Sequence, residues 1–82
     1  MRITVLYFAA VRDLVGKGEE QIDVPEQVVT IGALADHLVV RHRNLEGRLG
    51  PVRFAKNEEF VTYEATLTAG DVIALIPPVA GG

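Results

Sequence analysis

The last six residues of the chain, PPVAGG, are those whose types best suit a chemical step. Pro77 and Pro78 hold the backbone extended and prevent sheet pairing. Gly81 and Gly82 carry no side chains, so this end can thread a narrow channel. A terminal Gly-Gly alone is typical of a frayed end. Here it follows an apolar segment and two prolines without a spacer, which favours a working carboxylate at Gly82 on a semi-rigid stem.

The other side chains offer little for catalysis. The chain has no cysteine, which excludes a disulfide, a catalytic thiol and the carriage of sulfur as a cysteine persulfide. It has no serine either, so a serine triad is excluded. His37 and His42 would stand about 140° apart around a helix and could not chelate one metal together. We therefore predict no metal site and no permanently bound cofactor, with one histidine partly exposed and the other near the edge of the core.

Two adjacent acidic pairs, Glu19-Glu20 and Glu58-Glu59, fall in segments with strand character. Neighbouring residues on a strand point to opposite faces, so neither pair forms a paired-carboxylate site. We predict that both pairs are solvated.

Composition indicates a small globular protein. Its 82 residues fit one domain, with 49% hydrophobic and 23% charged residues. The formal net charge of −3 disfavours a nucleic-acid or anionic membrane surface and permits a partner with a basic docking face. The chain has no signal-peptide pattern and no apolar run as long as a membrane span, which takes about 18 residues. We expect a cytoplasmic protein.

These chemical features must be positioned by five predicted strands and one substantial helix. Thr30 is a suitable N-cap for the helix, whose apolar face would include Ile31, Leu34 and Leu38. Helical spacing continues to Leu45, and a glycine before Pro51 would end the helix. A short helical turn is predicted over residues 9–15. The predicted strands cover residues 2–8, 19–24, 52–55, 59–61 and 72–76.

The alternation along the strands also predicts an exposed apolar surface. If Ile73 faces the helix, Ile76 faces the other way, where Phe8 and Phe60 can join it. Such patches mark partner surfaces, although packing at the edge of the core would give the same pattern. We predict a docking patch of Phe8, Phe60 and Ile76 beside the tail, with Pro77 and Pro78 also contacting the partner.

The order of elements is that of an α+β protein with a mixed sheet around one main helix. This is the ubiquitin-like β-grasp arrangement. We predict a single domain over residues 1–82, of which residues 77–82 form an extended, flexible tail.

The chain resembles the family of molybdopterin synthase small subunits, also called molybdopterin converting factor subunit 1. The resemblance is carried by VLYFAAVRDLVG at residues 5–16 and by GDVIALIPPVAGG at residues 70–82. The Ala55-Lys56-Asn57 turn matches more loosely. The Pro-Pro-Val-x-Gly-Gly ending is the specific part, because Gly-Gly alone also ends ubiquitin and thiazole-pathway carriers.

The resemblance implies a sulfur carrier with no catalytic side chains of its own. A ubiquitin-activating-like adenylyltransferase would use ATP to adenylate Gly82, and a sulfur donor protein would convert it to a thiocarboxylate. The tail would then enter the large synthase subunit and give its sulfur to cyclic pyranopterin monophosphate. Arg12, in the matching segment, could add a charge contact to a partner, or be a solvated helix charge.

Three other functions fit the same residues. One is sulfur transfer to another client, in thiazole synthesis or tRNA thiolation. Another is a protein modifier joined to lysines through Gly82. The last is a non-covalent ubiquitin-like binding module, for which Gly81 and Gly82 would be dispensable.

Overall fold

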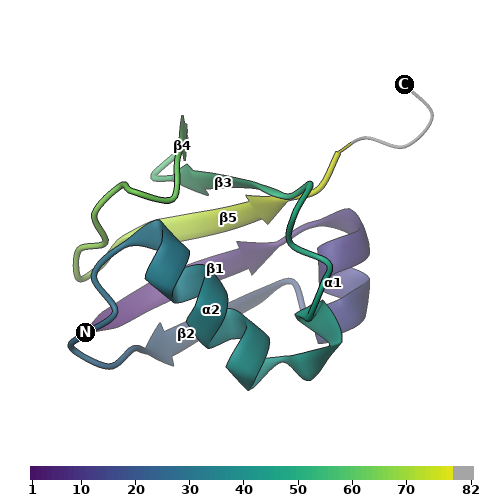
Figure 1. Ribbon diagram of the computed structural model, residues 1–82, viewed down its shortest axis with the longest axis horizontal. Helices are drawn as coiled ribbons and strands as arrows, with labels where there is room; N and C mark the ends of the chain where they lie inside the picture. The colour runs from purple at the N-terminus through teal and green to yellow at the C-terminus, as the bar shows by residue number, and fades with distance from the viewer. Residues whose placement is uncertain (79–82) are drawn as a thin grey trace.

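The sheet is organised around the pairing of its first and last strands. The computed structural model describes residues 1–78, in which β1 (Arg2–Tyr7) and β5 (Val72–Ile76) run parallel with Val5 opposite Ile73. β2 (Glu19–Asp23) pairs antiparallel with β1, and β3 (Arg53–Lys56) pairs antiparallel with β5. β4 (Glu59–Val61) adds to β3, giving the order β2-β1-β5-β3-β4 (Figure 1). The last strand therefore lies inside the sheet, as predicted.

One face of the sheet is covered by α2 (Ile31–Arg41) (Figure 1). Its start is confirmed, because the Thr30 hydroxyl accepts a hydrogen bond of 3.1 Å from the Ala33 N–H. Its predicted end is wrong. The backbone leaves the helical region at His42, and a 3₁₀ turn, η1 (Arg43–Leu45), follows. The turn buries Leu45 without a longer helix, because it redirects the chain toward the core.

A second, shorter helix, α1 (Ala9–Val15), follows β1 directly, as predicted for residues 9–15. It ends at Gly16, whose φ of 89° is a left-handed conformation that glycine adopts without strain. The Gly16 N–H donates a 2.8 Å hydrogen bond to the Arg12 carbonyl. α1 lies beyond the end of the sheet at which β1 and β5 both finish (Figure 1).

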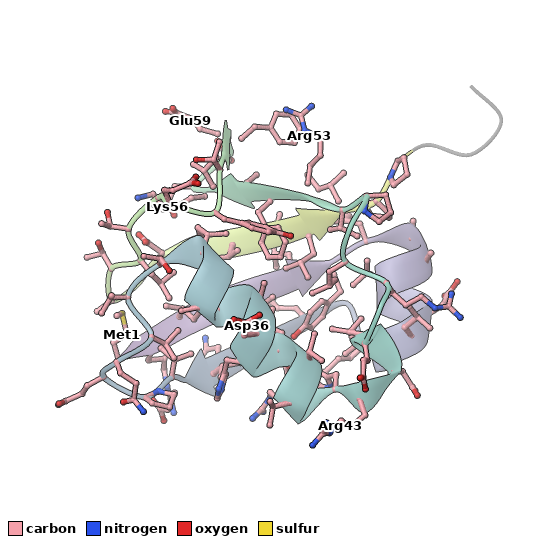
Figure 2. All side chains as sticks on the ribbon, viewed as in Figure 1. Met1, Asp36, Arg43, Arg53, Lys56 and Glu59 are labelled. Carbon is pink, nitrogen blue, oxygen red and sulfur yellow. The ribbon has the colours of Figure 1, made fainter. Side chains whose placement is uncertain are left out.

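The core fills the layer between the sheet and α2. Every second residue of β1 and β5 is buried, whereas Asp36 lies on the outward side of α2 (Figure 2). The predicted helix face is confirmed, because its three residues are fully buried. The central buried side chains are Ile3, Val5, Tyr7, Ile31, Leu34, Leu38, Ile73 and Leu75.

Glu20 departs from the predicted solvated pair. It is buried, and its carboxylate accepts a 2.6 Å hydrogen bond from the Tyr7 hydroxyl and contacts His42 Nε2 and Arg41. Burial raises the pKa of Glu20, but hydrogen bonds from Tyr7, His42 and Arg41 outweigh it and lower the pKa to about 2. Burial, together with the hydrogen bond to Glu20, raises the pKa of Tyr7. This cluster ties β1, β2 and the end of α2 together.

Within residues 1–78, no three metal-ligating side chains come together as a metal site. None of the helices described is long and apolar enough to span a membrane.

Candidate functional site

The site is centred on the end of β5, from which the stem, Pro77 and Pro78, continues. β5 is held on both sides, by β1 through a parallel ladder and by β3 through an antiparallel one. Pro77 is half-buried and Pro78 is exposed. Gly81 and Gly82, the predicted working residues, lie outside the described residues. The structure thus fixes the base from which the predicted tail starts.

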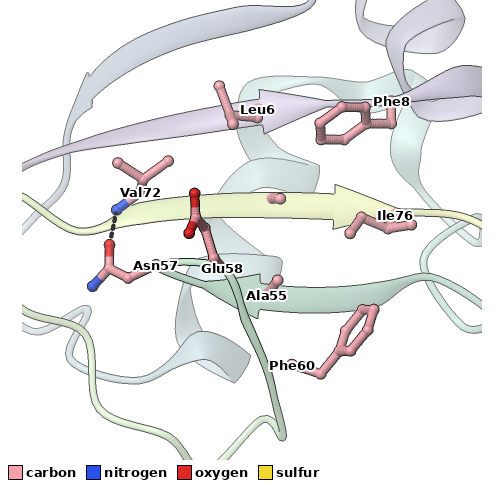
Figure 3. A pocket seen from close by; sticks show the side chains of 9 residues that line it. Leu6, Phe8, Ala55, Asn57, Glu58, Phe60, Val72 and Ile76 are labelled. Carbon is pink, nitrogen blue, oxygen red and sulfur yellow. Dashed lines mark hydrogen bonds between the residues drawn. The ribbon is translucent and has the colours of Figure 1, made fainter.

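The predicted patch residues come together in one groove on the face of the sheet opposite α2. Phe8, Phe60 and Ile76 line this outer groove, which has a volume of about 620 Å³ (Figure 3). Phe8 is 44% exposed and Phe60 is 54% exposed, which does not fit packing at the edge of the core. The three side chains come from β4, β5 and the residue after β1, so only the sheet register brings them together.

The floor of the outer groove is made of small side chains. Ala55 of β3 stands opposite Ala74 of β5, and Ala55 also stands opposite Phe60 of β4. Two alanines between larger neighbours leave the depression in the sheet surface that Figure 3 shows. The groove is therefore a product of strand register, and an apolar side chain of a partner would fit over the alanines.

Arg53 lies at the rim of the outer groove and was not identified from the sequence. Its guanidinium carbon sits 3.8 Å from the centre of the Phe60 ring, a cation–π contact. It pairs in register with Ile76, the last residue of β5. An arginine on a short strand carries no sequence signal of this contact, because the signal lies in the antiparallel pairing of β3 with β4 and β5.

The opposite end of the outer groove is polar. Asn57 and Glu58 line it, both with positive φ, a conformation that asparagine tolerates in turns. The Asn57 side chain accepts a 2.9 Å hydrogen bond from the Val72 N–H (Figure 3). It also donates a 3.0 Å hydrogen bond to the Asp71 carboxylate. The turn is thereby attached to the first residue of β5, which leaves Glu58 as the charged group at this end.

Arg12 does not line the outer groove. It is exposed on α1 and forms no ion pair with any residue that the structure describes. The aliphatic part of the Arg12 side chain lies over Gly18, where an added methyl group would be 3.2 Å from Arg12 Cδ. Arg12 is therefore not part of the outer groove, although its N–H donates a 3.3 Å hydrogen bond to the Phe8 carbonyl.

Comparisons with known proteins agree with this geometry. A model of the ThiS family matches residues 5–82. This chain belongs to the ThiS family. The molybdopterin synthase sulfur carrier subunit of Escherichia coli (strain K12) is 37% identical over 82 residues, covering 98% of this chain and 99% of that protein. The resemblance to molybdopterin synthase small subunits is thus confirmed.

Solved structures of similar proteins share the fold. The crystal structure of SAMP1, a small archaeal modifier protein from Haloferax volcanii, superposes with a TM-score of 0.88 at 29% identity, covering all of both chains. A chain in a complex of subunits 1 and 2 of molybdopterin-converting factor from Helicobacter pylori 26695 gives 0.70 at 25% identity, again over all of both chains. The predicted ubiquitin-like β-grasp fold is confirmed.

Proposed function

We propose that this ThiS-family protein is a cytoplasmic sulfur carrier for molybdopterin synthesis, working through the carboxylate of Gly82. One observation carries the proposal: β5, at the centre of the sheet, leads directly into a diproline stem. A molybdopterin synthase sulfur carrier subunit matches 98% of the same chain. A strand held on both sides gives the tail a fixed starting point. Fixed geometry of this kind lowers the entropic cost of aligning a reacting group.

The chemistry proceeds in steps that leave the chain unchanged overall. A carboxylate oxygen of Gly82 attacks the α-phosphorus of ATP, and pyrophosphate leaves. A donor then supplies sulfur at the oxidation level of sulfide, which attacks the carbonyl carbon and displaces AMP. The thiocarboxylate sulfur bonds to a carbon of cyclic pyranopterin monophosphate and displaces an oxygen from that carbon. Water then cleaves the bond between this sulfur and the Gly82 carbonyl carbon, which leaves the sulfur on the pterin and restores the carboxylate. No cysteine of this chain is required, consistent with its absence.

We assign partner binding to the outer groove. Phe8, Phe60 and Ile76 form an exposed apolar surface next to the base of the tail, so a protein that encloses the tail meets this surface first. Its occupants in this proposal are the large synthase subunit and the adenylyltransferase, each in turn. The similar chain in a complex with subunit 2 of molybdopterin-converting factor supports the first of these.

Protein modification is the second candidate. Its support is the close structural similarity to the small archaeal modifier protein SAMP1. Both functions need an activated Gly82, but they differ in the acceptor. Cell extracts containing the tagged chain would show lysine-linked conjugates for a modifier, and a thiocarboxylate on the free chain for a carrier.

The terminus provides the decisive experiment. The chain is incubated with the adenylyltransferase, ATP and a sulfur donor, and intact mass is measured for replacement of one oxygen by one sulfur. Deletion of Gly82 shortens the reach by about 3.3 Å, which exceeds the roughly 1 Å error that reactive geometry tolerates. We expect this deletion, and Gly81→Val, to abolish loading without changing the thermal midpoint. Pterin sulfuration by the deletion variant in a reconstituted synthase would disprove the proposal.

A further inference from the structure

The stem is bordered by a second groove, on the other side from the outer groove. Pro77 and Pro78 form one wall of this stem groove, whose volume is about 300 Å³. Leu14 of α1 forms part of the second wall, and the turn carrying Arg48 and Pro51 forms the third. Ile76, by contrast, faces the outer groove. A protein that closes around the stem therefore meets two separate depressions.

The walls of the stem groove are held in place by local hydrogen bonds. The Arg48 N–H donates to the Leu45 carbonyl at 2.9 Å, and the Val52 N–H donates to the Leu49 carbonyl at 3.1 Å. The Asn44 side-chain amide of η1 donates a 3.3 Å hydrogen bond to the Leu14 carbonyl, which joins the segment before the Arg48 turn to α1. Proline in two of the three walls further limits motion. A preformed groove loses little conformational entropy when it is filled.

Among residues 1–78, Arg48 is the only charged residue that lines this groove. It is exposed and forms no ion pair with any of residues 1–78. The other lining residues are apolar or glycine. An open groove with apolar walls and one exposed arginine is complementary to a protein segment that combines an apolar side chain with a carboxylate.

We propose that the stem groove is a second docking site for the large subunit of molybdopterin synthase. The large subunit inserts an apolar side chain between α1 and the stem and pairs a neighbouring carboxylate with Arg48. This inference rests on the proposed function, because it requires the large subunit to enclose the tail. By filling both grooves, the large subunit holds the stem from two sides and fixes the direction in which the chain continues toward Gly82.

The test measures affinity of the full chain for the large subunit by calorimetry. Arg48→Glu places a negative charge against the partner carboxylate, and we expect at least roughly tenfold weaker binding. Ala10→Trp fills the groove from the exposed side of α1 without a change in charge, and we expect a similar loss. Arg43→Glu is the matched control, because Arg43 is also exposed but lies outside the groove. We expect its affinity to stay within about twofold of the unmodified chain.

Equal losses for Arg48→Glu and Arg43→Glu would reduce the effect to long-range charge and overturn the inference. Unchanged affinity for Arg48→Glu would do the same. Arg48 and Ala10 are both exposed and should tolerate substitution. If Arg48→Glu or Ala10→Trp unfolds the protein, the affinity of the other variant decides the test. If Gly82 deletion abolishes pterin sulfuration while Arg48→Glu binds normally, only this inference fails. If the unmodified chain does not bind the large subunit, the proposed function fails with it.

The rival occupant of the stem groove is the chain's own terminal carboxylate, carried by Gly82, four residues beyond Pro78. That span reaches about 13 Å when extended. Amidation of Gly82 removes its charge, and the Arg48 Nε–H signal in the free protein reports any pairing by nuclear magnetic resonance. We expect the same signal in the amidated and unmodified chains. A shift on amidation would assign the groove to the tail and overturn the inference.

Discussion

Phe8 joins β1 to α1 and is the most informative single residue of the outer groove. It occupies the N-cap position of α1, where its side chain makes no capping bond. Phe8→Asp removes an exposed apolar ring and supplies a side chain that caps helices well. We therefore expect it to weaken binding to the large subunit and to the adenylyltransferase at least roughly tenfold, as for loss of an interface aromatic. The thermal midpoint should stay within a few degrees of its original value.

Phe8→Leu serves as the control, because it keeps an apolar side chain at the same position. Its binding should fall less than that of Phe8→Asp. If Phe8→Asp unfolds the protein, Phe8 belongs to the core and the docking role is wrong.

Glu20 predicts a specific response to acid. Its pKa in the folded protein is about 2, below its ordinary 4.5, so its ionised form stabilises the fold above about pH 4.5. This stabilisation is lost as the pH falls from 4.5 toward 2, and amounts to roughly 3 kcal/mol at most for such a shift. Unfolding in urea at several pH values should therefore show a steeper acid decline for the original chain than for Glu20→Gln.

Glu20→Gln keeps an acceptor for the Tyr7 hydroxyl but removes the charge facing Arg41, His42 and Lys17. It should be less stable than the original chain at pH 7, and the two should converge toward pH 2. If the free energies of unfolding of the two proteins changed in parallel with pH, the ionised Glu20 carboxylate would not stabilise the fold.

The sequence did not reveal the Glu20 cluster. Adjacency shows that Glu19 and Glu20 face opposite ways, but it does not show which face is buried. Tyr7 and His42 are 13 and 22 residues from Glu20 along the chain, and only the sheet pairing and the end of α2 bring them together. Arg53 over Phe60 escaped prediction for the same reason.

At the scale of elements, α2 depends on its apolar face. Leu38 is fully buried, so Leu38→Ala leaves a cavity under the helix. We expect a loss of roughly 2–5 kcal/mol in the free energy of unfolding measured in denaturant. Val40→Ala, on the exposed side of the same helix, is the control and should change stability by less than about 0.5 kcal/mol. A small effect at Leu38 would mean that the face has been placed wrongly.

Local signals predicted the elements well where they were self-contained. Thr30 caps its helix, and strand alternation separates Ile73 from Ile76 because both depend only on near neighbours. The end of α2 was missed because helical spacing persists to Leu45 in sequence. There the contact of His42 with Glu20 accompanies the exit from the helix, and a 3₁₀ turn still buries Leu45.

At the scale of the whole molecule, the fold was predictable and the stem groove was not. One amphipathic helix among alternating strands allows few arrangements, and a buried last strand must lie within the sheet. The stem groove, by contrast, needs α1, the turn at Arg48 and the stem to meet from three distant parts of the chain. Residues from three separate segments have no regular spacing along the chain, so no sequence pattern predicts that they meet.

The parallel pairing of β1 with β5 also determines how the protein bears mechanical load. A pull on the tail acts along β5, so the hydrogen bonds to β1 and β3 resist together in shear instead of opening one after another. Force spectroscopy with handles at the two termini should show one abrupt rupture. Gradual lengthening at low force would instead mean that β5 peels away.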